Sequence, residues 1–177
     1  DIDQASAFAT LFTGSNPCFS GIAGDKTFDF EKEKEVSILN DPEYLGNYTK
    51  ENYSPKNLFS STIGDELKIA SQGRSDVYSI APDAESAILS AGHAANGAFW
   101  MDNTNGKWAT TTYYKGIPWY VDRYNNGPES LASRLETMVW TPTLPMEKYD
   151  AFPYVLDDLP FRYTFSEKFA NLSLIHI

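Results

Sequence analysis

The sequence predicts an α/β fold with parallel strands in its sheet, and three observations lead to this prediction. Apolar residues recur at helical spacing in several segments, which predicts amphipathic helices. Short, mostly apolar segments bounded by turn residues predict strands between them. The helix predicted over 55–72 leads at once into a strand predicted over 76–80, and this order is half of a crossover between parallel strands.

The N-terminal segment is predicted to be a helix over 3–13, because its small and aromatic residues share one helical face. Asp1 or Asp3 is expected to cap it, since a carboxylate accepts hydrogen bonds from the free N–H groups and meets the positive end of the helix dipole. Gly14 is placed to end the helix.

Two further signals organise the first half of the chain. The run EKEKE at 31–35 alternates in charge and is interpreted as a solvated hairpin edge or loop. Ser54 followed by Pro55 is typical of a helix start, with serine as N-cap and proline in the first turn. The apolar spacing that follows predicts a helix over 55–72, which Gly73 ends.

The second half is predicted to alternate between short helices and strands. A helical turn is expected over 85–90, and strands over 98–101 and 107–114 flank DNTNG, a strong hairpin signal because Asn-Gly accepts positive φ. Helices are expected after Pro118 and over 130–138. Prolines at positions 142, 145, 153 and 160 then predict extended, loop-like backbone.

Composition excludes several classes of function. The chain has 177 residues, 42% of them hydrophobic, with 24 acidic and 14 basic side chains and a net charge of −10. This length predicts one domain with a real core, and the hydrophobic content excludes general disorder. No apolar run is long enough for a membrane helix. The acidic balance argues against nucleic-acid binding, which needs clusters of lysine and arginine.

The sequence holds no recognisable nucleophile motif and few histidines or cysteines for a metal site. Cys18 is the only cysteine, and His93 and His176 are the only histidines, so the chain offers no His-rich or Cys-rich zinc site. His93 is read as a hydrogen-bonded structural residue, with a ligand role as the alternative. A series of aromatic residues is read as core, with a stacking surface for sugars or bases as the alternative. This series comprises Phe99, Trp100, Trp108, Tyr113, Tyr114, Trp119 and Tyr120.

Three segments together resemble one protein family. They are LFTGSNPCFSGIAGD (11–25), SPKNLFSSTIGDEL (54–67) and VYSIAPDAESAILSAGHAANGAFWMDNTNGKWATTTYY (77–114). The sequence resembles the bacterial phosphate-irrepressible alkaline phosphatases, in the type I phosphodiesterase/nucleotide pyrophosphatase group of the alkaline phosphatase superfamily. The likeness continues more weakly through PWYVDRYNN and LPMEKYDAF, so it covers most of the chain.

The resemblance implies a three-layer α/β sandwich with a mostly parallel central sheet, to which a β-hairpin with aromatic residues is added. It also implies a periplasmic or secreted hydrolase with two zinc ions and a Thr or Ser nucleophile at a helix N-terminus. Two metals stabilise the attacking and leaving oxygens of an in-line displacement, and the helix N-terminus favours the phosphoryl anion. The resembled family carries its metal ligands before and far beyond the matched stretch, so no zinc is expected in this chain.

The residues at the expected catalytic positions depart from the family pattern. The nucleophile position falls on Gln4, whose carboxamide cannot be deprotonated to attack phosphorus. A shift of one residue gives Asp3 or Ala5, and neither is the expected hydroxyl. Asp3 is kept as a candidate residue of the site.

The phosphate-binding positions also carry residues that disfavour phosphate. The family's asparagine falls on Asp25, which places a negative charge where a phosphate anion would bind. The family's Lys-Asp-Arg triplet falls in APDAES at 81–86, which holds no basic residue. Asp83 and Glu85 stand there instead and are, with His93, the remaining candidate residues of the site.

Two hypotheses about function follow. In the first, residues 1–171 are an incomplete, N-proximal part of one domain of a phosphoric ester hydrolase that takes phosphate esters or other small anions, and this chain is itself inactive. In the second, the chain is a pseudoenzyme or binding protein that keeps the fold without the nucleophile and phosphate clamps. Residues 172–177 (LSLIHI) are interpreted as a non-native tail, with a terminal strand as the alternative.

Overall fold

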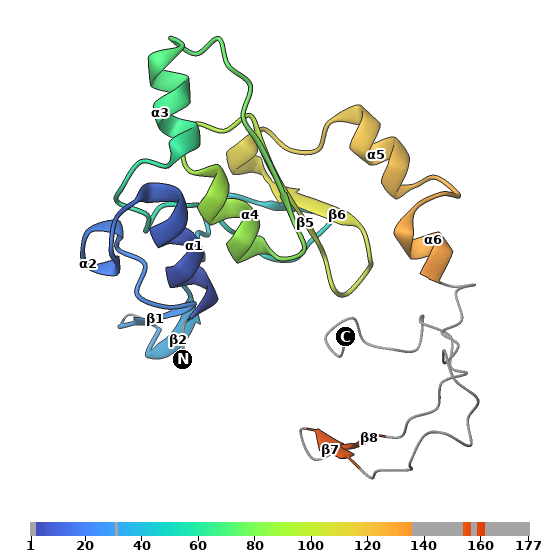
Figure 1. The fold of residues 1–177 in the computed structure, drawn as a ribbon. Coiled ribbons are helices and arrows are strands. Elements are labelled where there is room, and N and C mark those ends of the chain that lie inside the picture. Colours follow the sequence, from blue (N-terminus) through green and yellow to red (C-terminus); the bar gives the residue numbers. More distant parts are fainter. Residues whose placement is uncertain (1–2, 31, 136–153, 157–158, 162–177) are drawn as a thin grey trace, which may run out of the picture.

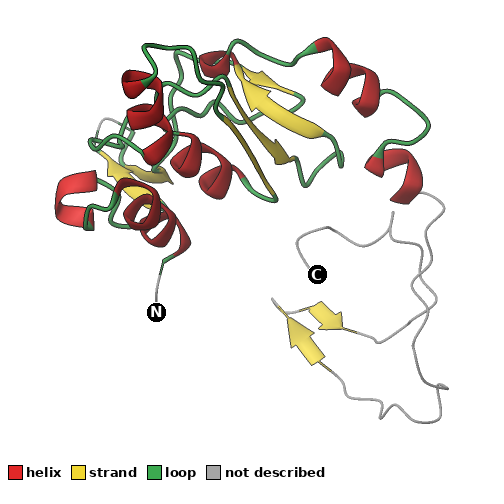
Figure 2. Ribbon diagram, turned by 45° about the horizontal axis from the view of Figure 1, so that its top comes forward, coloured by secondary structure: helices red, strands yellow, loops and turns green. Residues whose placement is uncertain are grey.

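A four-stranded mixed sheet organises the structure, a computed structural model that describes residues 3–30, 32–135, 154–156 and 159–161. The strand order is β3 (Gly46–Asn47), β6 (Trp108–Thr111), β5 (Gly97–Met101), β4 (Tyr78–Ala81). Strands β4 and β5 are parallel, while β5–β6 and β6–β3 are antiparallel. Figure 2 shows these strands beside the helices that pack on them. The predicted α/β class is confirmed.

Helix α4 (Ala84–Ala91) connects the two parallel strands and lies against both of them. Its N-cap is Asp83, whose Oδ1 accepts a hydrogen bond from the Ser86 N–H at 2.8 Å. Helix α1 (Gln4–Thr13) packs beside α4, as Figure 1 shows. The predicted end of α1 and its cap at Asp3 are confirmed, while the helix begins one residue later than predicted, because Asp3 accepts from the Ser6 N–H as N-cap and Gly14 has φ 66°.

The predicted helix over 55–72 is wrong in its first eight residues, since α3 runs from Ile63 to Ala70. Ser54 does not cap a helix, because its buried hydroxyl donates to the Asp41 carboxylate at 2.5 Å. Thr62 is the N-cap instead, in a capping box that Asp65 completes.

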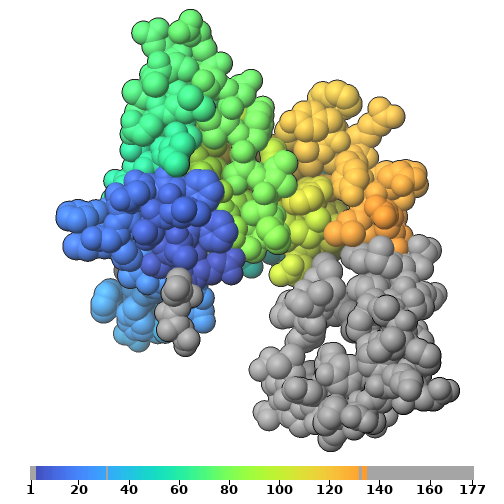
Figure 3. All heavy atoms as spheres, in the orientation of Figure 1, coloured from blue at the N-terminus to red at the C-terminus, as the bar shows by residue number. Residues whose placement is uncertain are grey.

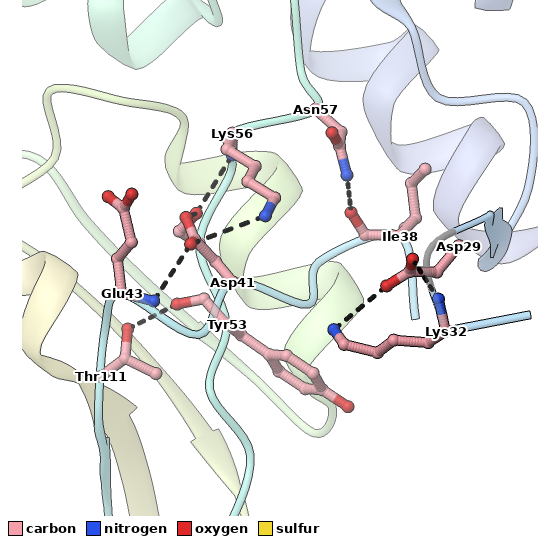
Figure 4. Close-up of polar contacts among 10 residues, drawn as sticks. Asp29, Lys32, Ile38, Asp41, Glu43, Tyr53, Lys56, Asn57 and Thr111 are labelled. Carbon is pink, nitrogen blue, oxygen red and sulfur yellow. Dashed lines mark hydrogen bonds and ion pairs between the residues drawn. The ribbon is translucent and has the colours of Figure 1, made fainter. Parts of the chain in front are cut away.

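The segment that replaces the expected helix is fastened to the rest of the chain by polar contacts, drawn in Figure 4. Lys56 Nζ lies 3.6 Å from the Asp41 carboxylate, and Asn57 donates to the Ile38 carbonyl at 2.5 Å. The Thr111 hydroxyl donates to the Tyr53 carbonyl at 2.8 Å, which ties the segment to β6. These long-range partners hold the backbone in a turn and irregular loop, with the Leu58 N–H donating to the Pro55 carbonyl, where the local pattern favours a helix.

The hairpin predictions are confirmed. Strands β1 (Lys26–Asp29) and β2 (Lys34–Ser37) pair antiparallel around the charged run. DNTNG connects β5 and β6, and its Gly106 has φ 65°. The strand expected over 107–114 is shorter, because β6 ends at Thr111 and a 3-10 helix, η1 (Thr112–Tyr114), follows.

The other described elements are short. Helix α2 (Pro17–Ser20) and strand β3 have no counterpart in the sequence predictions. Helix α5 (Trp119–Asn125) follows Pro118 as expected, and α6 (Leu131–Leu135) lies within the helix expected over 130–138. Strands β7 (Tyr154–Leu156) and β8 (Leu159–Phe161) pair with each other, and Pro160 is extended as expected. Pro142, Pro145, Pro153, His176 and the tail at 172–177 lie outside the described residues.

One hydrophobic core joins α1, α4 and the sheet. Burial of these side chains supplies most of the stabilisation, at about 25 cal/mol per Å² of apolar surface removed from water. Among the described helices, none is long and apolar enough to cross a membrane. The largest apolar side chains that are fully buried are Ile22, Leu39, Leu58, Ile88 and Leu89.

Candidate functional site

The start of α1 meets the start of α4 at the carboxyl end of β4. Gln4 is the first residue of α1, and Asp83 directly follows the residue after β4. Gln4 Nε2 donates to Asp83 Oδ2 and to Ser86 Oγ, each at 2.9 Å. The carboxamide at the expected nucleophile position is therefore held by the cap of the neighbouring helix.

Asp3 joins a second segment to this place. Its Oδ1 accepts from the Ser6 N–H at 3.0 Å, and its Oδ2 accepts from the Asp25 N–H at 3.3 Å. The Asp3 carboxylate thus caps α1 and fixes the backbone that follows GIAG. The tertiary structure therefore brings Asp3, Gln4, Asp25 and Asp83 to one region.

Glu85 adds a further carboxylate to this region. Burial raises the pKa of Glu85, and the nearby charges of Asp83, Asp25 and Glu51 raise it further. Four carboxylates, those of Asp25, Glu51, Asp83 and Glu85, therefore lie close enough to one another to act on Glu85. Negative charges at these positions disfavour a bound anion such as phosphate.

A pocket of about 210 Å³ opens at the carboxyl ends of the two parallel strands, beside these acidic residues. Ligands of open α/β sheets commonly bind at such an edge. Its walls include the rings of Tyr53 and Trp100, 6.4 Å apart, with the carboxylates of Glu51, Asp83 and Glu85. Burial raises the pKa of the Tyr53 hydroxyl, and the negative charge of Glu51 raises it further.

His93 is held elsewhere, by contacts that serve the fold. Its Nε2 lies 2.8 Å from the Leu58 carbonyl oxygen, and its backbone N–H donates to Asp65 Oδ1 at 2.9 Å. The Tyr113 hydroxyl donates to the His93 carbonyl oxygen at 3.3 Å. His93 is therefore hydrogen-bonded through both its ring and its backbone, which agrees with the interpretation of His93 as a structural residue.

Most of the aromatic series lies in or against the core. Phe99, Trp100 and Tyr114 are buried, and the Tyr114 hydroxyl donates to the Gly92 carbonyl at 2.8 Å. Trp119 and Tyr120 are exposed, with their rings 5.9 Å apart and nearly perpendicular. The series therefore does not form one continuous stacking surface.

The described residues do not fit a zinc site by themselves. Zinc in catalytic sites takes three protein ligands, usually histidine, carboxylate or cysteine. No group of three such residues is placed to hold a metal ion in the part of the chain that the structure describes. The Asp3 carboxylate is already used by two backbone N–H groups, as given above.

Sequence reasoning missed two residues of this region. Ser86 Oγ accepts a hydrogen bond from the Gln4 amide, and Glu51 lines the pocket. The local signal near Ser86 is Asp83, a preferred N-cap residue whose side chain accepts from the N–H three positions later. Nothing local to Glu51 marks it, because it reaches the pocket only through the folding of the 38–57 segment.

A change at Glu85 is expected to alter the pH dependence of stability. Its pKa is raised in the folded state, so the folded protein binds the proton more tightly and loses stability as the pH rises above 4.5. Glu85→Gln removes this loss and is expected to raise the urea midpoint at pH 7 more than at pH 4. Glu43→Gln, an exposed carboxylate elsewhere, is the matched control. Equal shifts at both pH values would contradict the expectation.

Comparison with known proteins gives a consistent result, although no protein-family model matches the sequence. The chain is 37% identical over 150 residues to alkaline phosphatase PafA of Elizabethkingia meningoseptica, covering 82% of this chain and 27% of that protein. It is 34% identical over 159 residues to alkaline phosphatase PhoV of Synechococcus elongatus, covering 85% of this chain and 28% of that protein. The crystal structure of wild type PafA matches with a TM-score of 0.72 and 35% identity, over 82% of this chain and 29% of that chain. The chain thus spans less than a third of the length of these relatives.

Proposed function

Because the chain belongs to the alkaline phosphatase superfamily over the stretch that it shares with these relatives, we propose that it is part of a phosphoric ester hydrolase and does not itself hydrolyse phosphate esters. The observation that supports the lack of hydrolytic activity is the environment of Gln4. Its amide is hydrogen-bonded to Asp83 and Ser86, where the resemblance implies a free hydroxyl nucleophile. A carboxamide lacks the ionisable hydroxyl that covalent phosphoryl transfer needs.

The charges around Gln4 support the same proposal. Phosphoryl-transfer sites stabilise the equatorial oxygens with positive groups and N–H donors. Here Asp25, Asp83 and Glu85 place carboxylates in that region. Restoring the hydroxyl alone therefore leaves the negative potential in place.

We expect Gln4→Thr to remain without hydrolytic activity. The measurement is release of p-nitrophenol from p-nitrophenyl phosphate and from bis(p-nitrophenyl) phosphate, with zinc added, for the wild-type chain and the variant. Two esters are used so that both monoesterase and diesterase activities of the proposed family are covered. Circular dichroism confirms that the variant folds. Zinc-dependent turnover by either chain would contradict the proposal.

A second candidate function is that of a binding protein that keeps the fold. The acidic pocket with its two aromatic walls favours it, because this lining suits a ligand other than phosphate. Calorimetric titration with inorganic phosphate tests the charge argument on which this candidate rests. Binding of phosphate to the wild-type chain would speak against both the negative potential and this candidate.

A further inference from the structure

The pocket beside the start of α4 combines aromatic side chains with carboxylates. Its volume is about 210 Å³, below the range of about 300–1,000 Å³ that holds drug-sized ligands, so it suits a smaller molecule. Trp100 of β5 and Tyr53 provide its aromatic rings, and Glu51, Asp83 and Glu85 provide its carboxylates. No lysine or arginine is among the described residues that line it. The pocket therefore offers a ligand both apolar contact and negative charge.

The walls of this pocket are held in place by the fold. Trp100 is 3% exposed and belongs to the hydrophobic core. The Tyr53 carbonyl accepts a hydrogen bond from the Thr111 hydroxyl at 2.8 Å, as Figure 4 shows. Asp83 caps α4, and α4 packs against α1; Figure 3 shows the blue atoms of the N-terminal segment directly against the green atoms of the α3–α4 region. Because the fold itself forms the pocket, little ordering cost opposes binding.

The carboxylates of the pocket have no cation of their own. In the part of the chain that the structure describes, none of Glu51, Asp83 and Glu85 forms an ion pair with lysine or arginine. Asp83 accepts hydrogen bonds from the side chains of Gln4 and Ser86, whereas Glu85 accepts none from a described side chain. Burial and neighbouring carboxylates raise the pKa of Glu85, as is expected of a carboxylate without a positive partner. A bound cation would relieve this repulsion.

The lining fits an organic cation better than a metal ion. Among the described residues, no group of three carboxylate, histidine or cysteine side chains is placed to hold a metal. An ammonium group needs only acceptors for its N–H donors, and carboxylates are strong acceptors for them. An aromatic ring attracts a cation over its face and contacts an alkyl chain as well. We propose that the pocket binds a primary alkylammonium ion, with its nitrogen at the Glu85 carboxylate and its chain along Tyr53 and Trp100. This proposal rests on the second candidate function, that of a binding protein, and names the class of its ligand.

Calorimetric titration of the chain with butylammonium chloride at pH 7 tests the proposal. The neutral probe of similar length is 1-butanol. We expect saturable binding of the amine and binding of the alcohol that is weaker by about tenfold or more, because the carboxylates require a charged donor. In NMR spectra, the amide signals of residues 84–85 and 101–104 should shift with the amine, since these residues line the pocket. Equal affinity for amine and alcohol would overturn the proposal.

Two variants locate the charge that the amine needs. Glu85→Gln keeps the shape of the side chain, removes its charge and is expected to weaken amine binding by about tenfold or more. Glu43→Gln removes the same charge from an exposed position outside the pocket, so it controls for the general attraction of cations to a chain of net charge −10. We expect the control to bind the amine as the wild-type chain does. Circular dichroism confirms that both variants fold.

Equal affinity of the wild-type chain and Glu85→Gln for the amine would overturn the proposal, as would the absence of saturable binding. Neither result would alter the proposed lack of hydrolysis, which Gln4→Thr tests separately. Binding of inorganic phosphate in place of the amine would overturn both this proposal and the second candidate function. The failure of the ligand class is thereby distinguished from the failure of the function on which it rests.

Discussion

Asp65→Ala is expected to lower the free energy of unfolding by about 4 kcal/mol, because it leaves one buried and two partly buried N–H donors without their acceptor. Asp65 is 5% exposed, and its Oδ2 accepts from the Thr62 N–H at 2.9 Å. Its Oδ1 accepts from the N–H groups of His93 and Ala94 at 2.9 and 2.7 Å. One carboxylate thus caps α3 and fixes the turn between α4 and β5.

The measurement is urea unfolding followed by circular dichroism. Glu66→Ala is the matched control, since Glu66 is the next residue of α3 and its carboxylate is exposed. We expect the control to cost less than about 1 kcal/mol, as surface substitutions usually do. Asp65→Asn, which keeps an acceptor oxygen of the same shape, should recover part of the loss. Similar costs for Asp65→Ala and Glu66→Ala would show that the carboxylate has no such role.

Leu89→Ala is expected to destabilise the protein by about 2–5 kcal/mol, because it opens a cavity in the core beneath α4. Leu89 is fully buried, and α4 is the element that contacts α1, β4 and β5 together. The matched control is Ile69→Ala in α3, which truncates an aliphatic side chain that is 67% exposed. That control should change stability by no more than about 0.5 kcal/mol. Thermal and urea unfolding measure the stability of both variants. Equal losses of stability would contradict the expectation that α4 forms the centre of the core.

The two strongest stability predictions concern the scaffold, whereas the candidate site rests on weaker contacts. The bonds from Gln4 to Asp83 and Ser86 join two helix starts and are partly exposed. Their loss affects the position of the carboxylates more than the stability of the fold. This separation allows Gln4 to be changed and its chemistry tested while the fold persists.

Local signals were sufficient where an element is determined by its own residues. Helices α1 and α4 begin at aspartates whose carboxylates cap the first turn, and both end at glycine. The hairpin at DNTNG depends on Gly106, whose positive φ an Asn-Gly pair predicts. The resemblance added the family and the candidate positions Gln4, Asp25, Asp83 and Glu85, and comparison with known proteins confirmed the superfamily.

Predictions failed where the decisive partner is distant along the chain. Ser54 and Pro55 have the local pattern of a helix start, but Asp41, 13 residues earlier, takes the serine hydroxyl. Strand β3 has two residues and exists only through its pairing with β6, more than 60 residues later. Neither event leaves a periodic signal in the local sequence.

The sequence by itself determined the α/β class and the capped helices, because each depends on residue type or on neighbours within one turn. It also led to the hypothesis that the nucleophilic hydroxyl and the basic phosphate clamps are replaced. Only the tertiary structure decided that Gln4 is bound by Asp83 and Ser86, that Asp3 holds the backbone of Asp25, and that the His93 ring meets the Leu58 carbonyl. Gln4 and Asp83 are 79 residues apart, so no pattern along the chain can bring them together. Packing of α1 on α4 over a parallel strand pair does so, because it places both helix starts at the same end of the sheet.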